Sequence, residues 1–193
     1  MCGVDEVGRG PLAGPVVACA VVIDQPLYVE FLDDSKTVTE LRRTALADTI
    51  RSKAVGFALG WATPDEIDRV NILGASKLAM GRALAGLAVN PDQVLVDAVR
   101  IPQCPFPQLA IVDGDAKSAV IAAASIVAKV FRDRWMDQCH SLYPDYGFAQ
   151  NKGYATLEHL RALASRGPSP IHRRTFAPVL QPSFDFLLDG TAL

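Results

Sequence analysis

The stretch Gly3-Val4-Asp5-Glu6-Val7-Gly8-Arg9-Gly10-Pro11 combines a short apolar segment, two adjacent acids and a glycine-rich turn that carries one arginine. The apolar start is typical of a strand, and the glycines predict a turn whose backbone can approach a ligand closely. Carboxylates bind hard divalent cations, and arginine binds phosphate. The stretch therefore predicts a strand that ends in a site for a metal ion and a phosphodiester, as in enzymes that act on nucleic acids.

Alternating and continuous apolar runs predict the other elements around this stretch. The strands are expected at residues 2–6, 16–23, 55–62, 94–99 and 109–112. The helices are expected at residues 38–53, 64–88 with a break near Asn71, 118–141 and 156–166. The first two strands should pair through the glycine-rich turn. Strands first, then helices and strands in alternation, then helices alone predict an α/β fold with a helical C-terminal part.

Two of these helices begin with a capping-box pattern, in which a threonine is followed three residues later by a glutamate. Thr37 and Glu40 form the first such pair. Thr63 and Glu66 form the second, with Pro64 at the first helical position, where proline is favoured. Both patterns predict a helix start.

The composition is that of a globular protein of one domain. The chain has 193 residues, of which 50% are hydrophobic and 21% are charged. This length allows one full hydrophobic core with a small helical appendage, but not two large domains. The composition also excludes a disordered or fibrous chain.

The net charge is only −2, so the chain as a whole is not a basic nucleic-acid binder. Positive charge is nevertheless concentrated between residues 151 and 174, a segment that has five lysines and arginines but only one acid, Glu158. An acidic metal site together with this basic region would bind a polyanion while the total charge stays near zero.

The four cysteines are far apart in the sequence and form no C-x-x-C pair, and the three histidines add no zinc-binding spacing. We expect free thiols in a reducing compartment and no structural zinc. The apolar run at residues 16–23 is too short to span a membrane, and no basic segment precedes it. These features predict a cytoplasmic protein without a membrane contact.

Acids at predicted strand ends are the candidate metal ligands. Asp5 and Glu6 close the first strand, and Asp97 lies in the apolar run Val94-Leu95-Val96-Asp97. An acid in such a run is costly to bury unless it is paired or binds a cation, so metal ligation is favoured over a salt bridge for Asp97. Hydrolysis of a phosphodiester with two metal ions needs several such acids from different parts of the chain.

Asp5 and Glu6 pose a geometric problem, because adjacent residues of an ideal strand point to opposite faces. Either the strand ends or bulges there, or one acid ligates indirectly. Asp5 is favoured as the direct ligand, and a solvated charge at the strand end remains an alternative for Glu6.

A further acid ligand is sought among Asp113, Asp115 and Asp133. Asp133 would lie about 22 Å along the helix from its start near Ser118, so it cannot share a pocket with Asp115. Asp133 also follows Lys129 by four residues, which predicts a helical ion pair. Asp115 is favoured because it precedes the helix closely, at the edge of the sheet where ligands bind in open α/β folds.

Beyond these individual residues, the chain resembles bacterial ribonuclease HII, the type 2 ribonuclease H family, through an ordered series of motifs along nearly its whole length. The motifs are residues 3–12, Asp34-Ser35-Lys36, Asn71-Ile72-Leu73, Gly114-Asp115 with 122–130, Tyr146-Gly147-Phe148-Ala149-Gln150, Lys152-Gly153-Tyr154 and His172-Arg173-Arg174. The resemblance implies a ribonuclease H-like fold, a five-stranded mixed sheet flanked by helices with a helical C-terminal extension. It also implies a catalytic domain at residues 1–142 and an extension at 143–193 packed on the same domain.

The activity implied by this resemblance is an endonuclease that hydrolyses the RNA strand of RNA/DNA hybrids. Such an enzyme also cuts 5′ of single ribonucleotides in duplex DNA, with a role in replication and repair, and leaves 3′-hydroxyl and 5′-phosphate ends. Two Mg²⁺ or Mn²⁺ ions are the implied cofactors, and a monomer is expected. A replication clamp or polymerase as a partner stays open.

The resemblance also implies roles for individual residues. Four acids match the catalytic metal ligands of the family: Asp5, Glu6, Asp97 and Asp115. Five further residues match its substrate contacts: Gly8, Arg9 and Gly10 in the turn that senses the 2′-hydroxyl, Lys36 on phosphate, and Tyr154, which stacks on the sugar at the RNA-to-DNA junction. Such contacts suit the substrate, because the 2′-hydroxyl distinguishes RNA from DNA and an aromatic ring stacks on nucleotides.

Three positions depart from the family pattern. Ala98 stands where glycine is common after the third acid, Asn151 where histidine is common before Lys-Gly-Tyr, and Thr37 where a second lysine is common after Ser35-Lys36. None of them removes a metal ligand.

Three questions stay open on the sequence alone. His172, Arg173 and Arg174 could contact phosphate or cap the C-terminal helices. A nuclease of the same fold that acts on structured DNA is a second hypothesis, and a hybrid-binding protein without catalysis is a third. The turn at Gly8 and the aromatic Tyr154 disfavour the nuclease that acts on structured DNA. The four acids disfavour the hybrid-binding protein without catalysis.

Overall fold

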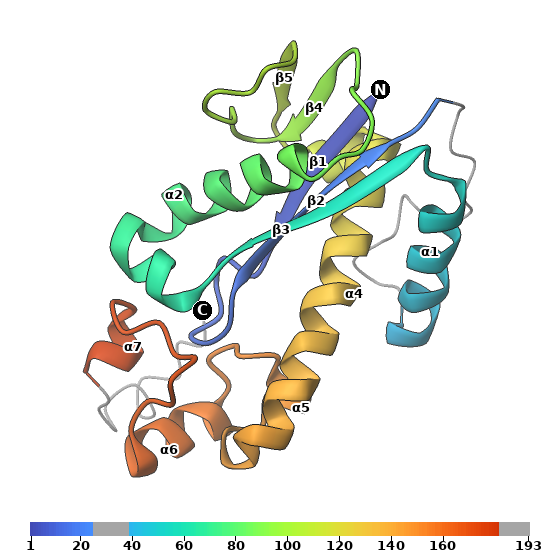
Figure 1. The fold of residues 1–193 in the computed structure, drawn as a ribbon. Coiled ribbons are helices and arrows are strands. Elements are labelled where there is room, and N and C mark those ends of the chain that lie inside the picture. Colours follow the sequence, from blue (N-terminus) through green and yellow to red (C-terminus); the bar gives the residue numbers. More distant parts are fainter. Residues whose placement is uncertain (25–38, 182–193) are drawn as a thin grey trace.

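The computed structural model describes residues 1–24 and 39–181. Five strands form one mixed sheet in the order β3-β2-β1-β4-β5, with helices on both faces (Figure 1). The strands are β1 (Cys2–Val7), β2 (Val16–Val22), β3 (Gly56–Ala62), β4 (Val94–Asp97) and β5 (Gln108–Ile111). The predicted α/β fold with a five-stranded mixed sheet is confirmed.

The first strand occupies the centre of the sheet and has unequal neighbours. It pairs with β2 in antiparallel register from Cys2↔Val22 to Val7↔Val17. Its parallel pairing with β4 runs only from Cys2↔Val94 to Val4↔Val96. The last residues of β1, including Asp5 and Glu6, therefore extend past the paired part of β4 (Figure 1).

Helices cover both faces of the sheet, and each face has its own hydrophobic core. Helix α2 (Pro64–Ala85) packs on one face, and α4 (Ala119–Leu142) with α1 (Glu40–Lys53) packs on the other (Figure 1). Successive side chains of β2 alternate between these cores, and all seven residues of the strand are buried. Because β2 is buried on both faces, every one of its positions is apolar, and the sequence therefore shows a continuous apolar run.

Two glycines allow the helices to lie directly against the sheet. A Cβ at Gly3 of β1 would lie 2.3 Å from the backbone carbonyl atoms of Val120 in α4. A Cβ at Gly60 of β3 would lie 2.2 Å from the carbonyl oxygen of Ala79 in α2. The start of α4 is thereby seated against β1 near the acids.

The single-turn helix α3 (Gly114–Lys117) lies between β5 and α4, and short helices after α4 complete the C-terminal part. These are the 3-10 helix η2 (Pro144–Tyr146), α5 (Phe148–Asn151), α6 (Leu157–Arg166) and α7 (Ala177–Leu180). Backbone hydrogen bonds from Leu12 N to Gly153 O (2.8 Å) and from Arg173 N to Leu12 O (2.9 Å) join this part to the β1–β2 connection. The C-terminal helices therefore lie beside the glycine-rich turn.

The structure corrects several predicted boundaries. Helix α1 begins at Glu40 with Thr39 as its N-cap, not at residue 38 after Thr37, which lies outside the described residues. The strand predicted at 94–99 ends at Asp97, because Ala98 adopts a left-handed conformation with φ 52°. Helix α3 was not expected.

Other predictions about local structure are confirmed. Thr63 and Glu66 form the reciprocal capping box, and Asn71 breaks α2 with φ 59° and ψ 170°. The four cysteines are free thiols. Among the described helices, none has both the length and the apolar character needed to cross a membrane.

Candidate metal centre and nucleic-acid interface

Three of the predicted acids meet at one edge of the sheet. Carboxylate oxygens of Asp5, Glu6 and Asp97 lie within 4.8 Å of one another. Asp5 and Glu6 come from the end of β1, and Asp97 is the last residue of β4. Because these two strands are parallel, their carboxyl ends lie at the same edge. Residues 91 and 92 positions apart in the chain are thus gathered into one acidic group.

The strand needs no bulge to place both adjacent acids there. Pairing of β1 with β2 is continuous through Asp5↔Cys19 and Glu6↔Ala18. The other side of β1 has lost its partner by this point, since pairing with β4 stops at Val4. The Asp5 carboxylate accepts a hydrogen bond from Glu6 N (2.7 Å). Of the alternatives considered, a bulge is therefore not what brings the two acids together, and both lie where β1 no longer pairs with β4.

Glu6 has one carboxylate oxygen that fits a cation. Its Oε1 accepts a hydrogen bond of 3.4 Å from Arg9 Nη1. Its Oε2 is buried and has no hydrogen-bond partner within the part of the chain that the structure describes. A buried acceptor without a donor is costly, and a hard cation ligated by oxygen would satisfy it. The donor set of three carboxylates therefore suits Mg²⁺ or Mn²⁺.

Asp97 is held in place by the turn after β5. Its Oδ1 accepts a hydrogen bond from Gly114 N (2.6 Å). A Cβ at Gly114 would lie 3.1 Å from that same oxygen and 2.7 Å from Ile121 Cδ1, so a side chain at this position would crowd the turn. The next residue, Asp115, lies in the first turn of α3, but its carboxylate is not part of the three-acid group.

The two other acids considered as ligands lie elsewhere. Asp113 is in a left-handed conformation with an exposed side chain, and its carboxylate is 3.8 Å from Lys117 Nζ. Asp133 forms the predicted ion pair with Lys129, at 2.8 Å. Neither belongs to the acidic group.

Burial and mutual repulsion make the group unfavourable when all its acids are charged. Burial raises the pKa of Asp5 to about 8, and the charges of Glu6 and Asp97 add to this rise, whereas a hydrogen bond with Ser125 opposes it. Burial also raises the pKa of Glu6, against the lowering effect of Arg9. A divalent cation would remove both penalties by favouring the ionised carboxylates.

The metal-free protein is expected to lose stability through the ionisation of Asp5 as the pH rises from about 4 to about 8. The pKa of Asp5 is about 8 in the folded protein and about 3.9 in the unfolded chain, so between these values the folded protein binds more protons and the free energy of unfolding falls with rising pH. Asp5→Asn should remove most of this dependence and be more stable than wild type at pH 9 by more than about 1 kcal/mol. Urea unfolding in EDTA would measure both effects. The same fall in the free energy of unfolding with rising pH in wild type and Asp5→Asn would contradict the prediction.

The glycine-rich turn and the predicted tyrosine lie side by side. A Cβ built at Gly10 would be 3.7 Å from Tyr154 Cε1, and the Tyr154 ring is partly exposed. Arg9 is exposed, and Gly8 has φ +91°, a conformation that favours glycine. Arg9, Gly10 and Tyr154 therefore belong to one surface, and Gly8 lies buried next to it. Lys36 lies outside the described residues.

Two buried arginines lie beneath this surface, and their side chains are inaccessible to solvent. Sequence reasoning missed Arg132 and left the role of Arg173 open. Arg132 could have been identified, because it falls on the buried stripe of α4 with Ala128 and Met136, at spacings of four. No sequence pattern around Arg173 indicates that its side chain is buried. Arg173 is neither a surface phosphate contact nor a helix cap, and His172 beside it is also buried.

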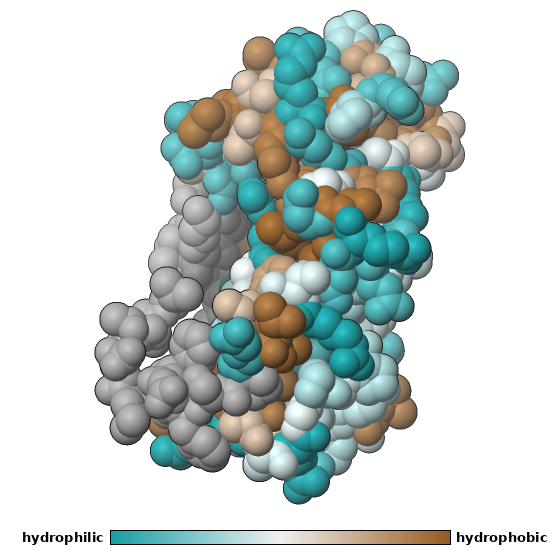
Figure 2. Space-filling view, turned by 90° about the vertical axis from the view of Figure 1, so that its left-hand side faces the viewer, coloured by the Kyte–Doolittle hydropathy of each residue, from teal (hydrophilic) through white to brown (hydrophobic). Residues whose placement is uncertain are grey.

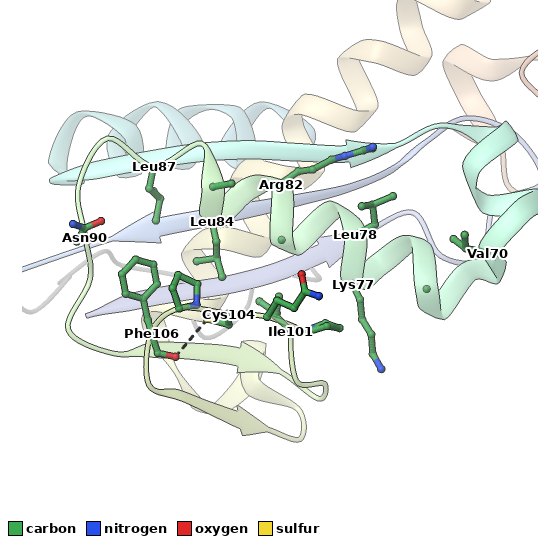
Figure 3. Close-up of a pocket in the computed structure, with 16 residues that line it drawn as sticks. Val70, Lys77, Leu78, Arg82, Leu84, Leu87, Asn90, Ile101, Cys104 and Phe106 are labelled. Carbon is green, nitrogen blue, oxygen red and sulfur yellow. Dashed lines mark hydrogen bonds between the residues drawn. The ribbon is translucent and has the colours of Figure 1, made fainter.

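A separate cavity lies away from the acids. It has a volume of about 780 Å³ and is formed between α2 and the segment that joins β4 to β5 (Figure 3). Hydrophobic residues gather near the middle of the face seen in Figure 2. The cavity's lining includes Leu78, Leu84, Ile101 and Phe106, and none of its residues is an acid. The lining therefore offers no carboxylate for a hard divalent cation.

Comparisons with known proteins show which family and which solved structures the chain is similar to. A sequence model of the family described as Ribonuclease HII matches residues 2–179. A protein named Ribonuclease HII from Desulfitobacterium hafniense is 55% identical over 181 residues, which cover 94% of this chain and 70% of the relative.

Two solved structures are also similar. Ribonuclease H2 from Pyrococcus horikoshii OT3 has a TM-score of 0.81 and 26% identity, covering 96% of this chain and 98% of the other. A complex of PCNA with RNase HII from Archaeoglobus fulgidus has a TM-score of 0.76 and 25% identity, again covering 96% and 98%.

Proposed function

The chain belongs to the ribonuclease HII family, and we propose that it cuts duplex DNA on the 5′ side of single embedded ribonucleotides as well as the RNA strand of hybrids. Members of the family are metal-dependent endonucleases with ribonuclease H activity on RNA/DNA. The observation that carries the finer proposal is that the turn lies close to the ring of Tyr154, whose Cε1 would be 3.7 Å from a Cβ built at Gly10. A backbone turn beside an aromatic face is suited to test one ribose within a duplex.

Asp5, Glu6, Asp97 and Asp115 would hold the divalent cations, Mg²⁺ or Mn²⁺. The first three are supported by their convergence within 4.8 Å and by the partnerless Oε2 of Glu6. Asp115 is supported by its place directly after Gly114, which is bonded to Asp97. When bound, a pair of such ions activates the attacking water and stabilises the charge on the departing 3′-oxygen. The expected products are a 3′-hydroxyl and a 5′-phosphate.

The chain's own groups would select and orient the substrate. Backbone atoms of Gly8, Arg9 and Gly10 come near the 2′-hydroxyl, and Tyr154 stacks on the adjacent sugar. Arg9, whose side chain is 48% exposed and lies 3.4 Å from Glu6, is placed to contact a phosphate while it orients that carboxylate. Lys36 is proposed as a further phosphate contact.

We assign residues 1–142 to the catalytic domain and 143–193 to an extension packed on it. The backbone bonds of Leu12 with Gly153 and Arg173 support a single packed unit. We further propose a cytoplasmic monomer. A sliding clamp is a candidate partner, because the Archaeoglobus fulgidus relative was solved with PCNA.

Cleavage of two matched duplexes tests the proposed function. One contains a single ribonucleotide, and the other has the same sequence in DNA alone. We expect Mg²⁺-dependent cleavage only of the first, at the 5′ side of the ribonucleotide, because the all-DNA duplex lacks the 2′-hydroxyl. Product ends can be assigned by extension with a DNA polymerase, which requires a 3′-hydroxyl. Equal cutting of both duplexes would refute the ribonucleotide assignment and favour a DNA endonuclease.

A further inference from the structure

Arg173 holds the glycine-rich turn from the inside. Its guanidinium donates hydrogen bonds to the carbonyl oxygens of Gly8 (2.5 Å), Arg9 (2.8 Å) and Gly14 (3.0 Å). Two of these acceptors belong to the proposed ribose-sensing turn. The side chain reaches them across more than 150 positions of sequence.

These carbonyls stabilise the positive charge of Arg173 by accepting its hydrogen bonds. Among the described residues, no carboxylate lies within ion-pair distance of its guanidinium. Burial, and to a smaller extent the charge of Arg132, lower the pKa of Arg173 to about 9, so the side chain remains protonated at neutral pH. A buried cation requires well-placed acceptors, and here all three are backbone carbonyls of the β1–β2 connection.

Fixing a carbonyl also fixes the amide that shares its peptide plane. In a trans peptide the C=O of one residue points opposite to the N–H of the next. The described residues contain no cis peptide bond. With the Gly8 and Arg9 carbonyls directed inward at Arg173, the N–H groups of Arg9 and Gly10 are directed away from it. These outward amides are donors that a 2′-hydroxyl oxygen can accept from.

The neighbouring groups hold Arg173 itself in place. Its backbone N donates to Leu12 O, and its guanidinium lies 5.1 Å from the centre of the Phe176 ring. Arg132 lies beside the same connection and donates to the carbonyls of Ala13, Pro15 and Lys152. The two arginines therefore join the turn to the segment that carries Tyr154.

We propose that Arg173 is a positioning residue that sets the amide directions of the Gly8–Arg9–Gly10 turn and thereby determines the enzyme's selectivity for ribose. The inference rests on the proposed function, in which this turn senses the 2′-hydroxyl. Arg173 itself does not contact substrate.

Arg173→Lys tests the proposal, because lysine keeps the charge but cannot form the three-way fork. On a duplex with one ribonucleotide we expect kcat to fall about 10²-fold, the effect of a small misplacement at a reacting centre. The KM and the Kd for all-DNA duplex should change less than about threefold, because phosphate contacts provide most of that affinity. Arg173→Gln is a second variant that removes the buried charge while one amide group remains as donor, and a fall in kcat at least as large is expected, because it also loses the fork that reaches the three carbonyls.

Asp68→Ala is the matched control for simple loosening of the same segment. The Asp68 carboxylate accepts hydrogen bonds from Arg174 N (2.8 Å), Thr175 N (3.0 Å) and Thr175 Oγ1 (2.6 Å), but it has no bond to the turn. We expect a lower melting temperature with kcat unchanged.

The outcomes separate the inference from the proposed function. A wild-type enzyme that cuts the ribonucleotide duplex and the all-DNA duplex equally contradicts the proposed function. A selective wild type together with a folded Arg173→Lys or Arg173→Gln variant of normal kcat contradicts only the role of Arg173. The same fall in kcat for Asp68→Ala would show that Arg173 acts through stability alone, and would also overturn the inference.

Discussion

Asp97→Asn is expected to lower Mg²⁺-dependent cleavage by about 10³-fold or more while the protein folds normally. The substitution removes one of three converging carboxylates and hence the charge that holds a divalent cation, whose catalytic contribution of several kcal/mol corresponds to such a factor. Asparagine keeps an oxygen in place for the hydrogen bond from Gly114 N. Single-turnover cleavage and thermal unfolding with and without Mg²⁺ would measure the effect, and the stabilisation by Mg²⁺ should shrink in the variant.

Asp113→Asn is the matched control for this prediction. It makes the same chemical change one residue before Gly114, on an exposed side chain outside the acidic group. Asparagine tolerates the left-handed conformation at this position, with φ 53°. Cleavage should stay within about threefold of wild type. Full activity of Asp97→Asn, or equal losses in both variants, would overturn the assignment of Asp97 as a metal ligand.

Gly3→Ala is expected to destabilise the protein by about 3 kcal/mol or more. The new methyl group would lie 2.3 Å from the carbonyl carbon and oxygen of Val120 and 2.7 Å from Ile121 N. These are backbone atoms at the start of α4, so no side-chain rotation can relieve the clash, and the helix must move away from β1. Since a domain is stabilised by only about 5–15 kcal/mol, this loss should be evident in urea unfolding.

Gly81→Ala provides the control, because it is the same substitution without the clash. The nearest atom to its Cβ would be Ile101 Cγ2 at 3.9 Å, an ordinary contact, and the residue lies inside α2. Alanine is favoured over glycine in a helix interior, so a gain of up to about 1 kcal/mol is expected. Unchanged stability of Gly3→Ala would mean that α4 is not seated on β1 as the structure has it.

Local patterns predicted most of the fold. The buried valine run of β2, the capping box at Thr63 and the break at Asn71 all act within a few residues, so the sequence shows them directly. The ends of the elements were predicted less well. Ala98 ends β4 through a left-handed conformation, and no neighbouring residue indicates this conformation. Helix α3 is a single turn and carries no apolar periodicity that could have predicted it.

The sequence predicted only part of the candidate site. Asp97 could be selected because an acid in an apolar strand is costly, and the structure places it with Asp5 and Glu6. How two adjacent strand residues reach one site could not be foreseen, because it depends on where β4 stops pairing with β1. The Asp115 carboxylate, chosen by its closeness to the sheet edge, is not in the group.

Local spacing and the order of motifs were enough to predict the long helices, the strands and the family, because these signals lie within a few residues of one another. Which acids meet, and where the buried guanidinium groups lie, depends on tertiary packing. Strand register and helix packing bring Asp5 to Asp97 and Arg173 to Gly8, and these contacts join residues about 90 and 165 positions apart. Chain connectivity sets no distance between such residues, so their chemistry appears only when the sheet and its helices are packed together.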